Sequence, residues 1–247
     1  MNLTEKNIRE KEFHNKLQSK KSGRFENIFY KAIYNLNEDF FRYLEKNSKN
    51  SEILDFGCGV GSSTEKVIKF NPKKITGIDI SEVSIQKAIS RAETTGANVE
   101  YKVDNCEKTN FKDNNFDIVY GTGILHHLQI EKCLDEIYRL LKPGGSLVFI
   151  EPLGTNPLIN LYRKFTPNSR SKDEHPLIDK DFKYIDSKFE KSEIKYYGFL
   201  TLIFFPFYKS PSCSKLFRFF AMLDQFLFKL KIFKLFAWSV LITAKKD

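Results

Sequence analysis

Three glycines follow the first β-rich run of the chain. Residues 52–56, EILDF, lead into a loop that holds Gly57, Gly59 and Gly61, and a helical pattern follows. A backbone needs glycine where it turns sharply or where a ligand approaches more closely than a Cβ would allow. A plain strand-to-helix turn would use such residues too, and a G-x-G-x-x-G dinucleotide loop is a sharper alternative. Ser62 stands where that motif has its third glycine, which counts against the dinucleotide loop but leaves it open.

Acidic residues stand at the ends of the next two β-rich runs. Asp79 closes KITGID, Asp104 closes VEYKVD, and Gly121 follows the later run FDIVY. A carboxylate can accept hydrogen bonds from both hydroxyls of a ribose, which suits Asp79. Asp104 can accept from the amino group of an adenine. Together with the glycine loop, these residues indicate an adenosine-bearing ligand that lies across the end of a sheet.

Short β-rich runs alternate with helical patterns in this part of the chain. Strands separated by helices of this length indicate right-handed crossovers and a mostly parallel sheet, with ligands at the carboxyl ends of the strands. After Glu151 the alternation stops for about 40 residues. The predicted strands are 52–56, 74–79, 99–104, 116–120, 146–151, 192–202 and 237–245, and the predicted helices are 25–44, 62–70, 81–94, 130–141 and 213–234.

Four segments, ILDFGCGVGSST, GIDIS, FDIVYGTGILHHL and LKPGG, resemble the successive motifs of class I S-adenosylmethionine-dependent methyltransferases. The resemblance covers residues 50–151 and is closest to the group with quinone-ring and natural-product methyltransferases. It implies a Rossmann-like α/β fold, with a seven-stranded, mostly parallel sheet, helices on both faces and an antiparallel last strand. It also implies S-adenosylmethionine as the cofactor.

The resemblance assigns parts of the cofactor to particular residues. It places one group of residues around the methionine part, Asp79 at the ribose, a second group at the adenine, and two residues beside the sulfonium. The methionine group is Asp55, Gly57, Gly59 and Gly61; the adenine group is Asp104, Asn105 and Cys106; the sulfonium pair is Gly121 and Thr122; Cys58 and Ile80 complete the cofactor-binding set.

Three residues are candidates for catalysis. Methyl transfer is an in-line displacement, so the enzyme holds the nucleophile close to the methyl carbon, excludes water and sometimes removes a proton. No metal is required, and none is predicted. His126 and His127 follow the fourth strand and Glu151 ends the fifth, and a histidine is the natural base near neutral pH. The alternative is that the histidines cap the next helix or pack beneath a lid.

The rest of the chain is predicted to serve the acceptor within a single domain, residues 1–247. Residues 1–48 are expected to form a helical lid, 50–151 the cofactor-binding core, 152–191 an acceptor-side insert, and 192–247 the last strands with a Phe-rich helical segment. In the insert, Arg163, Glu174 and His175 are candidates for acceptor binding. The alternative is an ordered surface crossover whose polar residues cap one another.

Charge and cysteine content limit the class of partner. The net charge of +9 comes from the ends: residues 1–31 carry +4 and residues 201–247 carry +6, so the middle is close to neutral. A nucleic-acid enzyme would place its basic residues around the catalytic face, so no nucleic-acid partner is expected. The four cysteines form no C-x-x-C pair, no secretory signal is visible, and the longest uncharged stretch is too short to span a bilayer. A cytoplasmic protein is expected, and its oligomeric state is left open.

The segment 199–236 contains 11 Phe with interleaved Lys and Arg. One apolar stripe with helical spacing is expected to pack on the sheet or cover the acceptor, and phenylalanines off that stripe leave peripheral contact with an anionic membrane as the alternative. The predicted stripe is Leu216, Phe219, Phe220, Leu223, Phe226, Leu227 and Leu230.

Three functions remain after this comparison. The leading one is methyl transfer to a sugar, quinone, or other small-molecule or lipid-linked acceptor. RNA methylation is a second, although neither an RNA-binding module nor a basic aromatic platform is visible. The third is a protein that binds S-adenosylmethionine without catalysis.

Overall fold

The sheet of this protein has the seven strands and the mostly parallel arrangement that the sequence predicts. The computed structural model describes residues 3–19, 28–95, 99–166, 171–208 and 210–247, and within them seven strands have the order β3-β2-β1-β4-β5-β7-β6. β7 is antiparallel to both neighbours, and the other pairs are parallel. The predicted Rossmann-like α/β fold is therefore confirmed. The strands are β1 (Glu52–Phe56), β2 (Lys74–Asp79), β3 (Val99–Val103), β4 (Phe116–Thr122), β5 (Leu141–Pro152), β6 (Lys191–Tyr197) and β7 (Ser239–Lys245).

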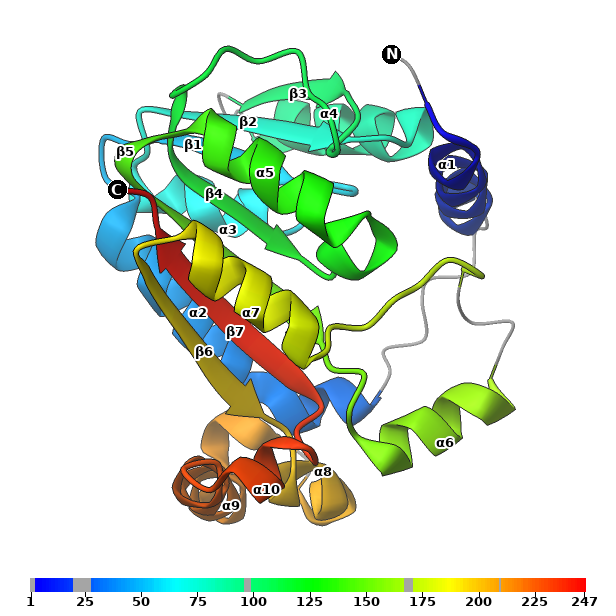
Figure 1. The fold of residues 1–247 in the computed structure, drawn as a ribbon, viewed down its shortest axis with the longest axis vertical. Coiled ribbons are helices and arrows are strands. Elements are labelled where there is room, and N and C mark those ends of the chain that lie inside the picture. Colours follow the sequence, from blue (N-terminus) through cyan, green and yellow to red (C-terminus); the bar gives the residue numbers. More distant parts are fainter. Residues whose placement is uncertain (1–2, 20–27, 96–98, 167–170, 209) are drawn as a thin grey trace.

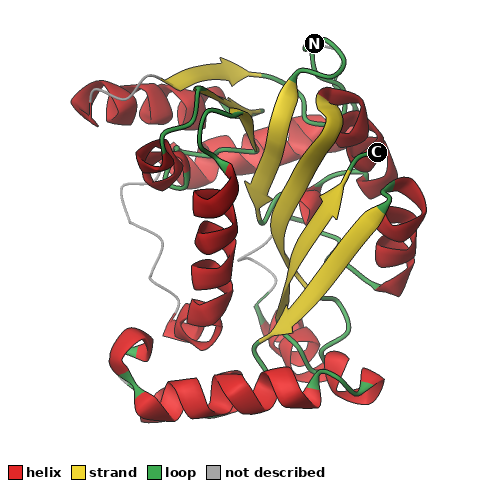
Figure 2. Cartoon of the chain, turned by 90° about the vertical axis from the view of Figure 1, so that its left-hand side faces the viewer, coloured by secondary structure: helices red, strands yellow, loops and turns green. Residues whose placement is uncertain are grey.

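Helices cover both faces of the twisted sheet (Figure 2). The α-helices are α1 (Glu5–Ser19), α2 (Tyr34–Asn47), α3 (Thr64–Val67), α4 (Glu82–Thr95), α5 (Ile130–Leu140), α6 (Pro157–Phe165), α7 (Asp179–Lys188), α8 (Leu200–Ile203), α9 (Lys215–Leu227) and α10 (Lys231–Lys234). Short 3-10 turns lie at η1 (Ile28–Ile33), η2 (Ile68–Phe70), η3 (Leu125–His127), η5 (Phe205–Phe207) and η6 (Pro211–Cys213).

The alternation of side chains along each strand divides the core into two layers. In β1, Leu54 and Phe56 enter a core shared with α5 and α7, whereas Ile53 packs into the core beneath α2. Figure 1 shows α5 and α7 in front of the sheet and α2 behind it. Both faces are covered, as a parallel sheet requires.

The two α-helices described within residues 1–48 occupy different places in the fold. α2 buries Leu36, Phe40 and Leu44 completely against the sheet, so it belongs to the core. α1 instead stands beside the carboxyl ends of the strands, apart from both layers (Figure 1). The expected helix 25–44 is η1 followed by α2, and its residues 25–27 lie outside the described part of the chain.

Several predicted boundaries are wrong. The strand predicted at 192–202 ends at Tyr197, because Gly198 adopts a φ of +82° that turns the chain into α8. The helix predicted at 213–234 is interrupted between α9 and α10, and the one predicted at 62–70 is a single turn of α3 followed by η2.

The stripe predicted on α9 faces mostly outward. Phe217 and Phe228, which lie off that stripe, are buried, together with Asp224. The Asp224 carboxylate accepts hydrogen bonds from the backbone N–H groups of residues 199–201 and from the hydroxyl of Thr201, so it fastens α9 to the start of α8. An exposed apolar stripe with helical spacing remains, and its members are Leu216, Phe219, Met222, Phe226 and Leu230.

Candidate active site

The glycine loop between β1 and α3 leaves room for a ligand. Gly59 has a φ of +53°, and a Cβ built there would meet no atom within 4 Å. Its backbone N–H donates a 2.9 Å hydrogen bond to Oδ2 of Asp79 at the end of β2. Close by, a Cβ on Gly121 would lie 2.5 Å from the ring of Phe149 and 2.7 Å from the carbonyl oxygen of Phe56, so β4 needs glycine there.

Asp79 is held in place by the loop that it faces. Its second oxygen, Oδ1, accepts a 2.8 Å hydrogen bond from the N–H of Ser81. Burial raises the pKa of the Asp79 carboxyl, and the two backbone donors oppose that rise. A carboxylate oxygen can accept two hydrogen bonds, so both oxygens of Asp79 can still accept from a ligand. The neighbouring Ile80 is half-buried, and a cavity of about 560 Å³ adjoins the loop at Val60.

Asp55 lies beneath the glycine loop. Its Oδ2 accepts hydrogen bonds from the hydroxyls of Thr64, at 2.6 Å, and Tyr120, at 2.8 Å. Burial raises the pKa of the Asp55 carboxyl to about 7, and the hydroxyl of Thr64 opposes this rise. Asp55 thus joins β1 to α3 and β4, and sequence reasoning missed both of its hydroxyl partners.

Residues 104–106 form the loop after β3. Asp104 accepts hydrogen bonds from the backbone of Asn105 and from Asn110, while the side chain of Asn105 accepts from Glu107 and donates toward Asn7 on α1. Cys58 and Cys106 are both buried, and burial raises their thiol pKa values well above the ordinary value.

Glu151 and His126 form a buried pair. Nδ1 of His126 lies 2.7 Å from Oε2 of Glu151, whose side chain is fully buried. The same carboxylate accepts backbone N–H donors at the start of η3, from Ile124 at 2.9 Å and Leu125 at 2.8 Å. Because an ionised carboxylate can only accept, Nδ1 of His126 donates and Nε2 is left as the basic nitrogen. Glu151 therefore orients His126.

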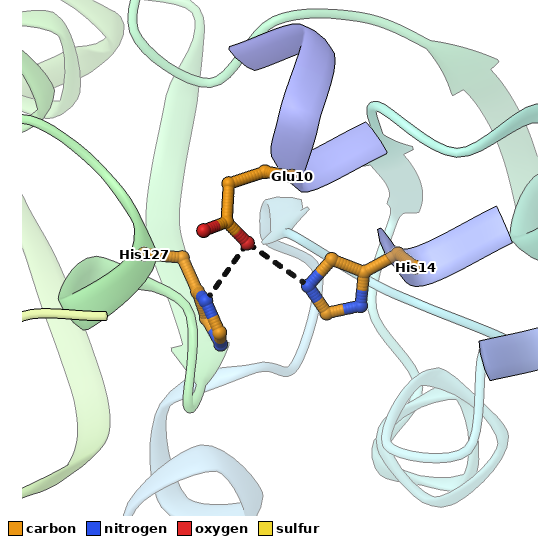
Figure 3. Close-up of side chains that lie close together, drawn as sticks. All are labelled: Glu10, His14 and His127. Carbon is orange, nitrogen blue, oxygen red and sulfur yellow. Dashed lines mark ion pairs between the residues drawn. The ribbon is translucent and has the colours of Figure 1, made fainter. Parts of the chain in front are cut away.

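His127 meets α1. Its Nδ1 lies 3.1 Å from Oε2 of Glu10, and the same Glu10 oxygen lies 3.6 Å from Nε2 of His14 (Figure 3). The rings of His126 and His127 are 4.1 Å apart between centroids. Sequence reasoning missed Glu10 and His14. The signal that could have found them is their spacing of four residues, which places both on one face of a helix.

The insert contributes unequally to this cluster. Glu174 joins His126 and His127 in one group whose candidate ligand atoms lie within 4.8 Å of one another. His175 donates its backbone N–H to the carbonyl oxygen of His126, and its ring lies 3.6 Å from Asp181. The guanidinium of Arg163 binds the carbonyl oxygen of Leu153 and the side chain of Asn160. Thr122 is exposed at the end of β4, and Gly121 is buried.

Polar contacts fasten α1 over this edge. Arg9 donates two hydrogen bonds, of 2.8 Å and 3.0 Å, to Asp173 of the insert. Lys11 pairs with Glu82 at the start of α4. Further contacts join Asn7 to Asn105, Glu10 to Ser171 and Asn15 to Ser81.

Comparison with known proteins relates the core of this chain to methyltransferases. Residues 53–145 match the family model of a methyltransferase domain. The chain is 30% identical to sterol 24-C-methyltransferase erg-4 of Neurospora crassa over 141 residues, which cover 52% of this chain and 37% of that protein. It is 31% identical to phosphoethanolamine N-methyltransferase 1 of Arabidopsis thaliana over 143 residues, which cover 55% of this chain and 29% of that protein. The chain thus spans roughly a third of the length of these relatives.

Two solved structures resemble the whole chain in fold. Geranyl diphosphate C-methyltransferase of Streptomyces coelicolor aligns with a TM-score of 0.68 and 15% identity over 100% of both chains. The N-methyltransferase NodS of Bradyrhizobium japonicum aligns with a TM-score of 0.65 and 14% identity, over 96% of this chain and 98% of that one. Likeness at these identities shows the fold.

Proposed function

Residues 53–145 are a methyltransferase domain of the class I S-adenosylmethionine-dependent type, and on that premise we propose that this chain transfers a methyl group to a small-molecule or lipid-linked acceptor. The observation that carries the proposal is the oriented His126–Glu151 pair beside the glycine loop. A protein that only binds the cofactor would need the glycine loop and Asp79 but no base. A buried histidine with its basic nitrogen set by a carboxylate adds the means to remove a proton.

The cofactor-binding residues fit S-adenosylmethionine. The open space at Gly59 admits a ligand close to the backbone, and Asp79 keeps acceptor capacity for the ribose hydroxyls. When bound, the cofactor supplies an activated methyl group on a sulfonium. In this proposal residues 104–106 border the adenine, and Gly121 and Thr122 border the sulfonium. Asp55 acts from below the loop, through Thr64 and Tyr120.

The chain's own residues perform three tasks in this mechanism. His126 accepts a proton from the acceptor at Nε2, and Glu151 stabilises the imidazolium that forms. α1 and the insert cover the site and exclude water, which strengthens every electrostatic interaction inside it. The carboxylate of Glu174 lies within 4.8 Å of ring nitrogens of His126 and His127, and Glu174 is the predicted acceptor residue that we assign to contact with the acceptor.

Peripheral contact with an anionic membrane is the second part of the proposal. The exposed apolar stripe of α9 is accompanied by exposed cations on α9 and α10, among them Lys215, Arg218 and Lys231. Apolar residues flanked by cations suit a surface of anionic headgroups. No helix among the described residues is long and apolar enough to span a bilayer.

The cysteines at 58, 106, 133 and 213 are free thiols, which supports a cytoplasmic location.

The proposal is tested with labelled S-adenosylmethionine and separate metabolite, lipid and RNA fractions from cells. We expect label in the metabolite or lipid fraction, and none with the matched variant Gly59→Val, whose side chain fills the ligand space. Label in RNA alone would replace the proposal with the RNA alternative. Cofactor binding without label in any fraction would favour a non-catalytic binding protein.

A further inference from the structure

Glu10, His14 and His127 form a cluster that the proposed reaction does not use. They come from two elements, α1 and η3, that meet over the strand ends (Figure 3). Oε2 of Glu10 lies 3.1 Å from Nδ1 of His127 and 3.6 Å from Nε2 of His14, and all three atoms lie within 4.8 Å of one another. A single ion placed among them would reach all three.

Two of these atoms are buried and unsatisfied. Oε2 of Glu10 and Nδ1 of His127 are buried and lie 3.1 Å apart as an ion pair, but neither makes a hydrogen bond of good geometry within the described part of the protein. Glu10 and His127 are 4% and 8% exposed. Leaving a buried polar atom without a hydrogen bond destabilises the folded protein, and a charged group does so more strongly. The arrangement therefore calls for a common partner between the two atoms.

We propose that Glu10, His14 and His127 bind a divalent transition metal of the zinc type. Two imidazoles and one carboxylate suit zinc, cobalt or nickel, whereas magnesium and calcium prefer oxygen ligands alone. The spacing of Glu10 and His14 presents both from the same face of α1, and His127 completes the set from the opposite side. This differs from the sequence analysis, which predicts no metal.

Three protein ligands leave a coordination position open, as in catalytic zinc sites. His127 also belongs to the group with His126 and Glu174, so the metal lies beside the proposed base and the proposed acceptor contact. Resting on the proposed function, the open position takes an oxygen of the acceptor, a hydroxyl or a phosphate. Coordination lowers the pKa of such a hydroxyl and fixes its position. Because two ligands lie on α1, the site is complete only when α1 is in place.

The test is metal binding by the full chain, after removal of any tag and treatment with a chelator. Wild-type protein titrated with Co²⁺ should bind one equivalent and develop visible d–d absorption, which Zn²⁺ then displaces. Glu10→Gln and His14→Ala should each weaken Co²⁺ binding at least about 100-fold, since loss of an outer partner alone costs 10–100-fold. Glu12→Gln is the matched control, because Glu12 is exposed on the same helix.

Two results would overturn the site: no stoichiometric Co²⁺ binding by the wild type, or wild-type binding by both ligand variants. His14 is partly exposed at the helix surface, so His14→Ala keeps the test valid if Glu10→Gln does not fold. Calorimetry of S-adenosylmethionine binding and the methylation assay on the same samples separate this inference from the proposed function. If the wild type binds no metal but still methylates an acceptor, the metal site is refuted and the proposed function stands.

Discussion

The buried carboxyl of Asp55 gives the protein a pH-dependent stability that one substitution should remove. Burial raises its pKa from the ordinary 3.8 to about 7. The folded protein therefore holds this proton up to about pH 7, whereas the unfolded chain releases it near pH 4. Between those values the folded state binds more protons, so the free energy of unfolding falls as pH rises.

The magnitude follows from the shift. A shift of about three pKa units corresponds to roughly 4 kcal/mol at about 1.4 kcal/mol per unit, and most of it, about 3 kcal/mol, is lost between pH 5 and pH 8. Asp55→Asn keeps an oxygen that accepts from Thr64 and Tyr120 but has no proton to lose in this range. The free energy of unfolding of the variant, relative to that of the wild type, should therefore rise by about 3 kcal/mol from pH 5 to pH 8.

Urea unfolding at pH 5, 6, 7 and 8, without cofactor, measures this difference directly. Asp179→Asn is the control, because Asp179 is exposed at the start of α7, and its difference from wild type should stay flat. A difference between Asp55→Asn and wild type that changes by less than about 1 kcal/mol across the series would refute a protonated Asp55 in the folded protein.

Three further predictions concern function. Asp79→Ala should weaken S-adenosylmethionine binding tenfold or more in calorimetry, since charge-assisted hydrogen bonds of about 1.5–3 kcal/mol each are lost, and unchanged affinity would contradict the cofactor assignment. His126→Ala should lower turnover about 10²–10⁴-fold without changing cofactor affinity. If His126→Ala and His127→Ala both turn over like the wild type, neither histidine is the base, and the enzyme acts by positioning the acceptor alone. The double change Met222→Ser with Phe226→Ser should reduce sedimentation with anionic vesicles at low salt tenfold or more, because each exposed side chain loses about 1.5–3 kcal/mol of burial; absence of wild-type binding at low and physiological salt would remove the membrane proposal.

Local chemistry made the sheet and the ends of β1 and β2 predictable. The glycine loop and Asp79 depend on features that are adjacent in sequence, a short apolar run followed by residues that a turn or a ligand requires. His126 and Glu151 were predictable for the same reason, because His126 follows β4 and Glu151 stands near the end of β5, its parallel neighbour. Their 2.7 Å contact needs the register of β4 against β5, which the sequence does not display.

The outward face of α9 could not be predicted from periodicity. Leucine and phenylalanine surround this helix, so the apolar pattern alone does not choose a side. Asp224, which is 1% exposed, decides the orientation. Its carboxylate accepts hydrogen bonds from the backbone N–H groups at the start of α8, which have no partner within that helix. A buried polar residue that satisfies backbone donors thus outweighs the larger stripe, and Phe219 and Phe226 are left facing outward.

The same reasoning distinguishes α2 from α1 within the segment 1–48, which the sequence predicts to be a lid. Complete burial of Leu36, Phe40 and Leu44 stabilises the docking of α2 by about 1.5–3 kcal/mol per side chain, so α2 cannot leave the sheet without unfolding it. α1 buries Asn7 and Glu10 instead, and it is fastened by polar contacts and ion pairs. Exposed ion pairs contribute little stability, because water and salt screen their charges. α1 is therefore held over the strand ends largely by polar groups, and this polar inner face is the reason why apolar periodicity does not reveal it.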